Sequence, residues 1–362
     1  MNSQTNDTFS GTREVSEAHA FDTQALQAWA SQHVKDFSGP LTVEMFKGGQ
    51  SNPTYKLNTP KRSYVMRAKP GPVAKLLPSA HAIEREFKVM SALAQTDVPV
   101  AQMLALCEDE SVIGRAFYIM EFVQGRVLWD QSLPGMTPEQ RRAHYLELNR
   151  VMARLHLAPY AQIGLQDYGK PGNYIERQIG RWSKQYQASI TQPIEAMDRL
   201  IEWLPQHMPA SSKSELTSIV HGDYRIDNVM YHPEKPQIMA VLDWELSTLG
   251  HPLADFSYHC MAWHIPPGTF RGLGGVDLAP LGIPLEDEYI RLYCDQTGLA
   301  NPVDLKTDWN FYLAYNMFRI AAILQGIAKR VENGTASSAQ AKASGAGARP
   351  MAELAWRFAQ RA

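Results

Sequence analysis

Two short apolar runs in the middle of the chain each lead directly into acidic or amide side chains. The first run, SIV, precedes HGDYRIDN, which covers residues 221–228, and the second lies in VLDWE, with Asp243 at its centre. Short apolar runs bounded by polar turn residues are typical of β-strands. We therefore expect Asp223, Asn228 and Asp243 to stand in loops at strand ends. The fold of this chain therefore has to place strand ends next to residues 223, 228 and 243.

The first 123 residues carry the pattern of a small sheet with helices. Alternating runs and a helical periodicity predict the order β-β-β-α-β-β after one opening helix. The expected helices cover 21–34 and 76–95, and the expected strands lie in 41–59 (a hairpin), 62–70, 100–107 and 115–123.

The rest of the chain predicts mainly helices. Thr137 is followed three residues later by Gln140, a capping-box pattern that marks the start of a helix over 137–158. The tail at 336–349 is rich in Gly, Ala and Ser, which favours a flexible loop before a short last helix. The remaining expected helices cover 174–190, 194–204, 287–297, 309–332 and 351–361.

Composition excludes several classes of protein. The 362 residues are 44% hydrophobic, which is enough for a sizeable core and two lobes or domains. A net charge of −2 disfavours a general nucleic-acid or anionic-membrane binder. No window holds eighteen uninterrupted apolar residues, so we expect no transmembrane helix. The three cysteines have no metal-ligand spacing, and together with the lack of a signal peptide they favour a cytoplasmic protein with reduced thiols.

Asp223, Asn228 and Asp243 have the residue types that phosphoryl transfer from ATP requires. Such a reaction needs positioning, Mg²⁺ to neutralise the phosphates, and a group that orients the attacking hydroxyl. An Asp in a loop can accept the hydroxyl proton. Oxygen ligands from an Asn and a second Asp suit a hard cation. An isolated match of this kind is weak, and an ordinary turn is the alternative.

The strand-rich first part of the chain, followed by a mainly helical part, strengthens the match. Together with two sequence motifs, it leads to a family resemblance. HGDYRIDNVMY resembles the catalytic loop of the aminoglycoside phosphotransferase family, and LDWELSTLGHPLADFSY resembles its metal-binding segment. The resemblance covers about 40–330. It implies an α+β, bilobal protein-kinase-like fold with a small antiparallel-sheet N-lobe, one long N-lobe helix and a larger, mainly helical C-lobe. The implied division is a disordered leader at 1–20, a nucleotide-binding lobe at 21–123 and a catalytic and substrate lobe at 124–362.

A narrower resemblance concerns three other segments. GGQSNPTYKL, LLPSAHAIEREFKVM and PGNYIERQIGRWSKQY are similar to the kinase-like domain that precedes acyl-CoA dehydrogenase modules in some larger proteins. Members of that group are implicated in phosphorylating hydroxyacyl-CoA substrates. The resemblance therefore implies an ATP- and Mg²⁺-dependent phosphotransferase that acts on a hydroxyl of a small molecule.

The resemblance also implies roles for individual residues. Asp223 is the catalytic residue, and Asn228 and Asp243 hold Mg²⁺. A turn that covers the phosphates, with backbone N–H groups suited to anions, is formed by Gly48, Gly49, Gln50 and Ser51. Glu121 and Val123 occupy the place of a hinge that contacts adenine. A simple hairpin turn and a plain buried strand end are the respective alternatives.

One position departs from the kinase pattern. The third strand usually provides a Lys that contacts the phosphates and pairs with a helix Glu, and here Arg67 stands in that place. Arg binds phosphate in a bidentate manner, so the role is physically allowed. Lys69 has the same strand parity and remains an alternative. The expected partner is Glu86, with Glu84 second.

Two further features bear on the catalytic loop. By resemblance Asp255 braces that loop, although from the bare sequence a helix N-cap is equally plausible, and His221 could hold the loop by hydrogen bonding. A metal site that combines His221 with His251, His259 or His264 is the alternative, but the spacing is irregular.

The acceptor is only partly constrained. Twelve residues separate Asp243 from Asp255 and no APE element follows, so a protein substrate is disfavoured. Helical spacing places Arg177, Arg181 and Lys184 on one stripe, which is either a solvated face or the border of a site for an anionic substrate. The alternatives are an aminoglycoside or choline/homoserine-type kinase and a nucleotide-binding pseudokinase. The sequence reports neither the nucleotide preference nor the oligomeric state.

Overall fold

The computed structural model describes residues 11–47, 52–70, 82–213, 216–268, 272–335 and 341–362. The chain divides into two compact units. The sheet unit comprises the described residues of Met1–Trp129 together with Ala161–Tyr168 and Asp227–Ser247. The helical unit comprises the described residues of Asp130–Tyr160, Gly169–Ile226 and Thr248–Ala362. The boundary between Ile226 and Asp227 therefore assigns Asp223 and Asn228 to different units.

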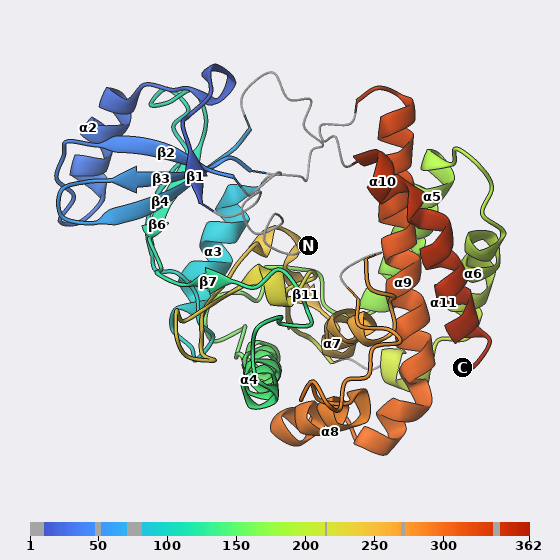
Figure 1. Cartoon of the computed structure of the whole chain (residues 1–362). Helices are drawn as coiled ribbons and strands as arrows, with labels where there is room; N and C mark the ends of the chain where they lie inside the picture. The colour runs from blue at the N-terminus through green and yellow to red at the C-terminus, as the bar shows by residue number, and fades with distance from the viewer. Residues whose placement is uncertain (1–10, 48–51, 71–81, 214–215, 269–271, 336–340) are drawn as a thin grey trace. The chain divides into compact units, whose positions relative to one another are not determined.

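The sheet unit is built on an antiparallel sheet of six strands (Figure 1). The predicted hairpin, third strand and last two strands are all present. The strand order is β1 (Thr12–Arg13), β2 (Thr42–Phe46), β3 (Thr54–Asn58), β4 (Ser63–Ala68), β6 (Phe117–Glu121) and β5 (Met103–Cys107).

Each face of this sheet is covered by one helix. On the first face, Leu26 and Ala30 of α2 (Thr23–His33) pack in one apolar cluster with strand residues such as Met66 and Ile119. On the other face, Ile83 at the start of α3 (Ile83–Leu93) packs against Tyr118. Because strand side chains alternate between faces, the residue after Met66 points to the α3 face. Strand parity thus decides which helix Arg67 can reach.

A second, smaller sheet in the same unit carries part of the predicted site. It is formed by β7 (Arg126–Val127), β9 (Val229–Tyr231) and β10 (Ile238–Val241), in the order β10-β9-β7. Arg85 of α3 holds the neighbouring segments in place. Its guanidinium lies over the Tyr168 ring, 4.3 Å from the centroid, and donates to the Tyr168 carbonyl at 2.8 Å. The Tyr168 hydroxyl in turn lies 2.6 Å from the Ser247 hydroxyl.

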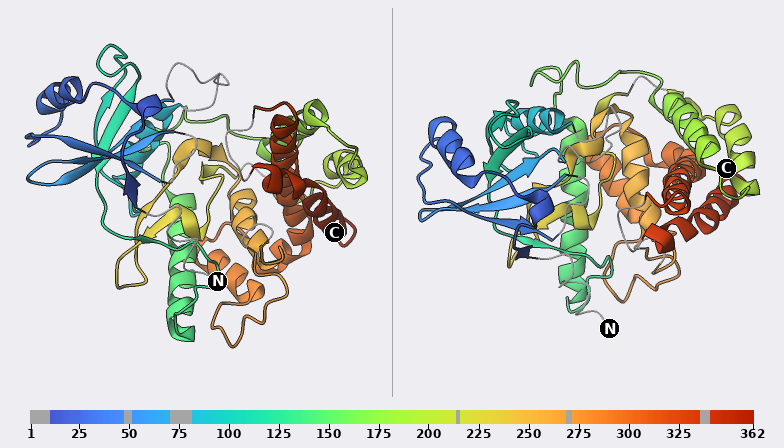
Figure 2. Two further views of the ribbon diagram at one scale, coloured as in Figure 1. Left: turned by 45° about the horizontal axis from the view of Figure 1, so that its top comes forward. Right: turned by 90° about the horizontal axis from the view of Figure 1, so that it is seen from above.

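The helical unit is organised around its longest helix. Helices α5, α7, α10 and α11 pack on α9, and α4 packs on α8, as Figures 1 and 2 show. A two-stranded sheet of β8 (Ser218–Val220) and β11 (Thr248–Gly250) lies in the same unit. The helix bounds are α4 (Pro138–Leu157), α5 (Tyr174–Ser189), α6 (Glu195–Gln206), α7 (Pro252–Cys260), α8 (Glu286–Thr297), α9 (Pro302–Glu332), α10 (Ala341–Ala346) and α11 (Ala348–Ala359).

The predicted helix caps and helix starts agree with the structure only in part. The capping box is present, because Gln140 N–H donates to Thr137 Oγ1 at 3.3 Å while Thr137 N–H donates to Gln140 Oε1 at 2.9 Å. Helix α7 was not predicted as an element. Helix α9 begins at Pro302, seven residues before the expected start at 309, with Asn301 as its N-cap.

Two predictions of disorder are wrong for the residues that the structure describes. Within the expected leader, Thr12 and Arg13 pair with β2, and the Thr12 hydroxyl donates to Glu44 at 2.8 Å. An available strand edge thus orders a polar segment. Within the expected loop at 336–349, α10 forms because Gly345 fits closely against α9, where an added Cβ would lie 2.8 Å from Ala328 Cα.

Two general features of the chain were also predicted. Cys107, Cys260 and Cys294 are buried free thiols. Over the described ranges, no helix has both the length and the hydrophobicity that crossing a bilayer requires.

Candidate active site

Arg67 lies at the centre of a cluster of carboxylates in the sheet unit. Its Nε is 3.2 Å from Glu86 Oε2, and its Nη2 is 3.0 Å from Asp243 Oδ1 and 3.6 Å from Glu245 Oε2. Burial opposes the charge on the guanidinium, but the acidic neighbours, led by Glu86, raise the pKa of Arg67 above its ordinary value. Arg67 is therefore a fixed positive charge held by side chains from α3 and from the loop after β10.

Glu86 is held on three sides. In addition to Arg67, it accepts hydrogen bonds from Asn52 Nδ2 at 3.0 Å and from the Tyr118 hydroxyl at 3.2 Å. The residue is only 2% exposed, and burial raises the pKa of its carboxyl although the charge of Arg67 lowers it. Because leaving either member of a buried ion pair alone is costly, each partner needs the other.

Lys69, the alternative to Arg67, pairs with a different carboxylate. Its Nζ contacts Glu84, and both side chains are more than a quarter exposed. The structure thus forms the predicted Arg67–Glu86 pair and gives Lys69 the partner that was placed second. Their roles toward a nucleotide remain predictions.

Asn228 and Asp243 lie at the same end of the β9–β10 hairpin. Val229 pairs with Val241 in antiparallel register, and Leu242 N–H donates to the Asn228 carbonyl at 2.8 Å. Asp243 adopts φ 62°, a left-handed conformation in which Asp is tolerated better than most residues. The hairpin therefore places Asn228 and Asp243 at one end, with Asp243 directed to Arg67.

The hairpin end has the oxygen donors that a hard cation requires. Mg²⁺ is commonly bound by one or two carboxylates together with substrate phosphates and waters, rather than by a complete protein cage. Asn228 and Asp243 fit this mode. Among the described residues there is no group of three or more His, Cys, Asp or Glu side chains arranged to hold a metal.

The segment HGD in the helical unit, predicted to form the catalytic loop, is held by one buried carboxylate. Asp255 of α7 accepts from His221 N–H at 2.7 Å and from Gly222 N–H at 2.9 Å. His156 Nε2 lies 3.2 Å from the same carboxylate. Burial opposes ionisation of Asp255, but the hydrogen bond and charge of His156 lower its pKa. The expectation that Asp255 braces this loop is confirmed, and the N-cap of α7 is His251 instead.

The Asp223 side chain is oriented by residues that the sequence did not single out. The Tyr258 hydroxyl donates to Asp223 Oδ1, and Arg225 Nε lies 3.4 Å from the same oxygen. Asp223 N–H lies 3.2 Å from His221 Nδ1, so His221 does hold the loop. Tyr258 stands three residues after Asp255 on the same helix, and residues at this spacing lie on one helix face. That spacing could have indicated from the sequence that Tyr258 faces the same loop as Asp255.

The imidazole alternative fails among the described residues. His251, His259 and His264 each contact a separate partner: the Ser211 carbonyl at 2.9 Å, the Tyr289 hydroxyl at 3.0 Å and Glu286 at 2.8 Å, respectively. Burial lowers the pKa of both His251 and His259 to about 4. These imidazoles are structural hydrogen-bonding groups rather than a metal site.

The structure gives less information about the remaining residues that were predicted to contact the nucleotide. Gly48, Gly49, Gln50 and Ser51 lie outside the described residues. Glu121 ends β6, and its carboxylate accepts from Gln102 N–H at 3.0 Å. Val123 lies between β6 and β7 and is partly buried. Their hinge role stays a prediction.

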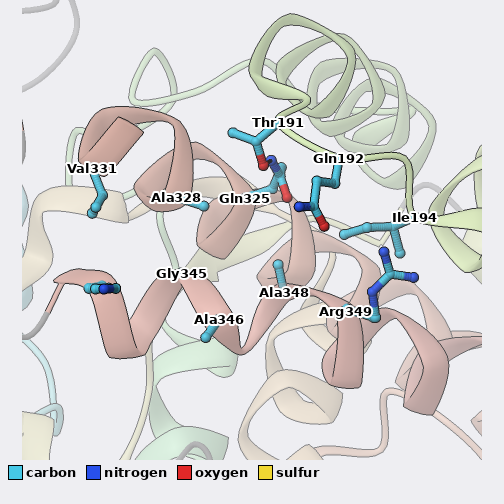
Figure 3. Close-up of a pocket in the computed structure, with 11 residues that line it drawn as sticks. Thr191, Gln192, Ile194, Gln325, Ala328, Val331, Gly345, Ala346, Ala348 and Arg349 are labelled. Carbon is cyan, nitrogen blue, oxygen red and sulfur yellow. Dashed lines mark hydrogen bonds between the residues drawn. The ribbon is translucent and has the colours of Figure 1, made fainter. Parts of the chain in front are cut away.

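A separate cavity of about 300 Å³ lies between the α5–α6 turn and helices α9, α10 and α11 (Figure 3). It contains none of the predicted site residues. Buried Gln325 is fixed there, since its Nε2 donates to the Ser189 carbonyl at 2.8 Å and to Thr191 Oγ1 at 2.9 Å. The charged residues in its wall are Lys342 and Arg349, so the cavity is cationic.

A comparison with protein families decides the class. The model of the phosphotransferase enzyme family (APH) matches residues 42–296. The chain belongs to this family. The predicted family and the assignment of the chain as a phosphotransferase are thereby confirmed.

The relatives of this phosphotransferase agree with the narrower resemblance. The chain is 48% identical over 351 residues to acyl-CoA dehydrogenase family member 10 of Mus musculus, with 96% of this chain and 32% of that protein aligned. The chain thus spans about a third of the length of this relative.

Solved structures confirm the predicted kinase-like α+β fold. A provisionally named aminoglycoside phosphotransferase of Ralstonia eutropha is 64% identical with a TM-score of 0.86, covering 94% of this chain and 99% of that one. Choline kinase of Cryptosporidium parvum is 12% identical with a TM-score of 0.64, covering 94% and 96%, and this likeness concerns the fold alone.

Proposed function

We propose that this phosphotransferase transfers the γ-phosphoryl group of ATP, with Mg²⁺, to a hydroxyl of a small molecule. The observation that carries the proposal is the position of Asp243. It shares one hairpin end with Asn228 and forms an ion pair with the largely buried Arg67, which is itself paired with Glu86. The cation proposed to bind phosphate and the two proposed metal ligands thus belong to one compact unit.

The nucleotide side of the reaction is assigned to the sheet unit. Arg67 binds the phosphates in place of the usual Lys, and Glu86 fixes its orientation. Asn228 and Asp243 hold Mg²⁺, which when bound neutralises charge on the phosphates. Gly48, Gly49, Gln50 and Ser51 provide backbone N–H groups to the phosphates, while Glu121 and Val123 contact adenine.

The acceptor side is assigned to Asp223 of the helical unit. The acceptor oxygen forms a bond to the γ-phosphorus as the bond to the bridging oxygen of ADP breaks, and Asp223 accepts the hydroxyl proton. Tyr258 and the loop braced by Asp255 orient this carboxylate before reaction. Such preorganisation is the main contribution that a protein makes to phosphoryl transfer.

A hydroxyacyl-CoA is the acceptor that we favour. The support is the likeness over nearly the whole chain to acyl-CoA dehydrogenase family member 10, together with the cationic cavity beside α9. An aminoglycoside or a choline/homoserine-type acceptor is the alternative, and it has no comparable feature among the described residues. The buried free thiols support a reducing compartment such as the cytoplasm.

A screen of hydroxylated metabolites with ATP and Mg²⁺ tests the proposal. Mass spectrometry is expected to detect a phosphorylated product, one ADP per product, and Asp223→Asn should lower the rate by about 10²- to 10⁴-fold. Asp304→Asn is the matched control, because this carboxylate lies in the first turn of α9 and outside the site. A pseudokinase would bind ATP without forming product, and that result would refute the proposal.

A further inference from the structure

A buried arginine of the helical unit stands beside the catalytic loop, on the acceptor side. Arg319 of α9 is 7% exposed and donates from Nη2 to the Gly222 carbonyl at 2.7 Å. Its guanidinium carbon lies 5.0 Å from the centroid of the Tyr258 ring and 5.7 Å from that of Trp182. One cation therefore contacts the loop backbone and two aromatic rings from other helices.

The charge of Arg319 is stable in this setting. Burial opposes it, but interactions with Tyr174, Tyr258 and Tyr315 and with the carboxylate of Asp223 raise the pKa of Arg319. Burial also raises the pKa of Tyr258, so this hydroxyl stays protonated and donates to Asp223. The ring that touches the catalytic carboxylate is thus the same ring that carries the guanidinium on its face.

This arrangement bears on which acceptors can bind. Proteins recognise quaternary ammonium groups by placing them against open aromatic faces. Here the faces of Tyr258 and Trp182 are both next to a guanidinium, and a second cation there would meet a like charge. An acceptor with a carbonyl, carboxylate or phosphate near its hydroxyl would be attracted by the same charge.

We propose that Arg319 determines the acceptor class by occupying the face of the Tyr258 ring beside Asp223, which excludes cationic acceptors and favours anionic ones. This inference rests on the proposed phosphotransfer to a small-molecule hydroxyl. It adds a specificity-determining residue that acts through Tyr258 and the loop backbone.

The test compares acceptors of opposite charge on wild type, Arg319→Met and Arg319→Lys. The acceptors are hydroxybutyryl-CoA, choline and kanamycin, and the readouts are kcat/KM and ligand-dependent thermal stabilisation. In wild type we expect hydroxybutyryl-CoA to be preferred over both cations. Arg319→Met should lower the ratio of kcat/KM for hydroxybutyryl-CoA to that for either cation by about tenfold, in line with the free energy of a desolvated cation–π contact. Arg319→Lys, which keeps the charge, should retain most of it.

Arg199→Met is the matched control. Arg199 also lies over a tryptophan, 5.6 Å from the Trp356 centroid, but it is exposed and pairs with Glu195. Its replacement should leave the preference unchanged. Wild type that binds or phosphorylates choline or kanamycin better than hydroxybutyryl-CoA would overturn the role of Arg319, even if Arg319→Met does not fold, and would leave phosphotransfer standing. Failure to phosphorylate any acceptor would instead refute the proposed function, and thermal stabilisation would still decide the charge preference.

Discussion

Arg67 of the sheet unit and Arg319 of the helical unit, both with little exposed surface, are stabilised in opposite ways. Arg67 in the sheet unit is surrounded by the carboxylates of Glu86, Asp243 and Glu245. Arg319 in the helical unit is held by a backbone carbonyl and two aromatic rings. The first charge is balanced by other charges, whereas the second is balanced by dipoles and ring faces. Removing the first should therefore leave buried charges unpaired, and removing the second should not.

The largest effect is expected at Arg67. Arg67→Met leaves the buried Glu86 carboxylate without its cation, a loss that costs about 3–5 kcal/mol in comparable buried pairs. Lys69→Met should cost much less stability, because the partly exposed Lys69–Glu84 pair contributes only about 0–1 kcal/mol to the free energy of unfolding. Arg67→Met should also weaken ATP binding far more than Lys69→Met does, because Arg67 is the residue assigned to the phosphates. Urea unfolding and calorimetric titration with ATP measure the two effects.

The double variant Arg67→Met/Glu86→Leu sharpens this contrast. Replacing both members of a buried pair by apolar side chains is often neutral or stabilising. We therefore expect it to recover most of the stability but none of the ATP affinity. Equal losses of ATP binding in the Arg67 and Lys69 variants would contradict the assignment of Arg67.

A smaller effect is expected from the carboxylate that braces the catalytic loop. Asp255→Asn keeps one carbonyl acceptor but sets an amide N–H₂ against a backbone N–H of His221 or Gly222, and a buried unsatisfied donor costs about 1–3 kcal/mol. The rate of phosphotransfer should fall while the dissociation constant for ATP stays near the wild-type value. Stopped-flow assays and titrations separate these quantities, and an equal loss of both would contradict a role confined to the helical unit.

Acid should weaken the helical unit through its buried histidines. Burial holds the pKa of His251 and His259 at about 4 in the folded protein, against an ordinary value of 6.5. The unfolded chain therefore binds more protons within this window, and the free energy of unfolding falls as pH decreases from 6.5 to about 4. Each histidine contributes a slope of up to about 1.4 kcal/mol per pH unit.

His259→Gln checks the source of this slope. Urea unfolding between pH 6.5 and about 4 should show that the free energy of unfolding depends less steeply on pH in this variant than in wild type. The slope should fall by about the contribution of one histidine. A variant whose stability depends on pH as steeply as wild type would show that other groups cause the acid sensitivity.

The smallest effect is expected at the cationic cavity. The double variant Lys342→Ala/Arg349→Ala should raise the KM for an anionic acceptor severalfold, about 1 kcal/mol, and leave the KM for ATP unchanged. Lys329→Ala is the control, since this side chain pairs with Glu332 at 2.7 Å on the same helix α9. An unchanged KM for every anionic acceptor would remove the cavity from the acceptor path.

Local sequence patterns predicted the parts of the site that depend on neighbouring residues. The resemblance to the kinase pattern selected Arg67 and its α3 partner Glu86, while strand parity left Lys69 open, and the resemblance on the HPLADF segment placed Asp255 behind the loop. Strand-end placement was predicted for Asn228 and Asp243, whereas their position on one hairpin is a finding of the structure. These features depend on period and spacing, which a sequence displays directly.

Contacts between distant segments were not predictable in this way. Arg85 ties α3 to Tyr168, and Arg319 reaches Gly222 from almost a hundred residues away. Such contacts depend on helix packing, for which a single sequence carries no periodic signal. The helix α10 was missed for a related reason, because its Ala- and Gly-rich composition matches a loop until close packing on α9 is known.

The account rests most directly on the separate roles of Asp223 and Asp243, and one measurement addresses both. Binding of ATP in the presence of Mg²⁺ and the rate of phosphotransfer are measured for wild type, Asp223→Asn and Asp243→Asn. The account predicts that Asp223→Asn binds the nucleotide as wild type does but loses transfer, while Asp243→Asn loses both. Wild-type rates of transfer in Asp223→Asn, or unaltered Mg²⁺-dependent nucleotide binding in Asp243→Asn, would contradict it.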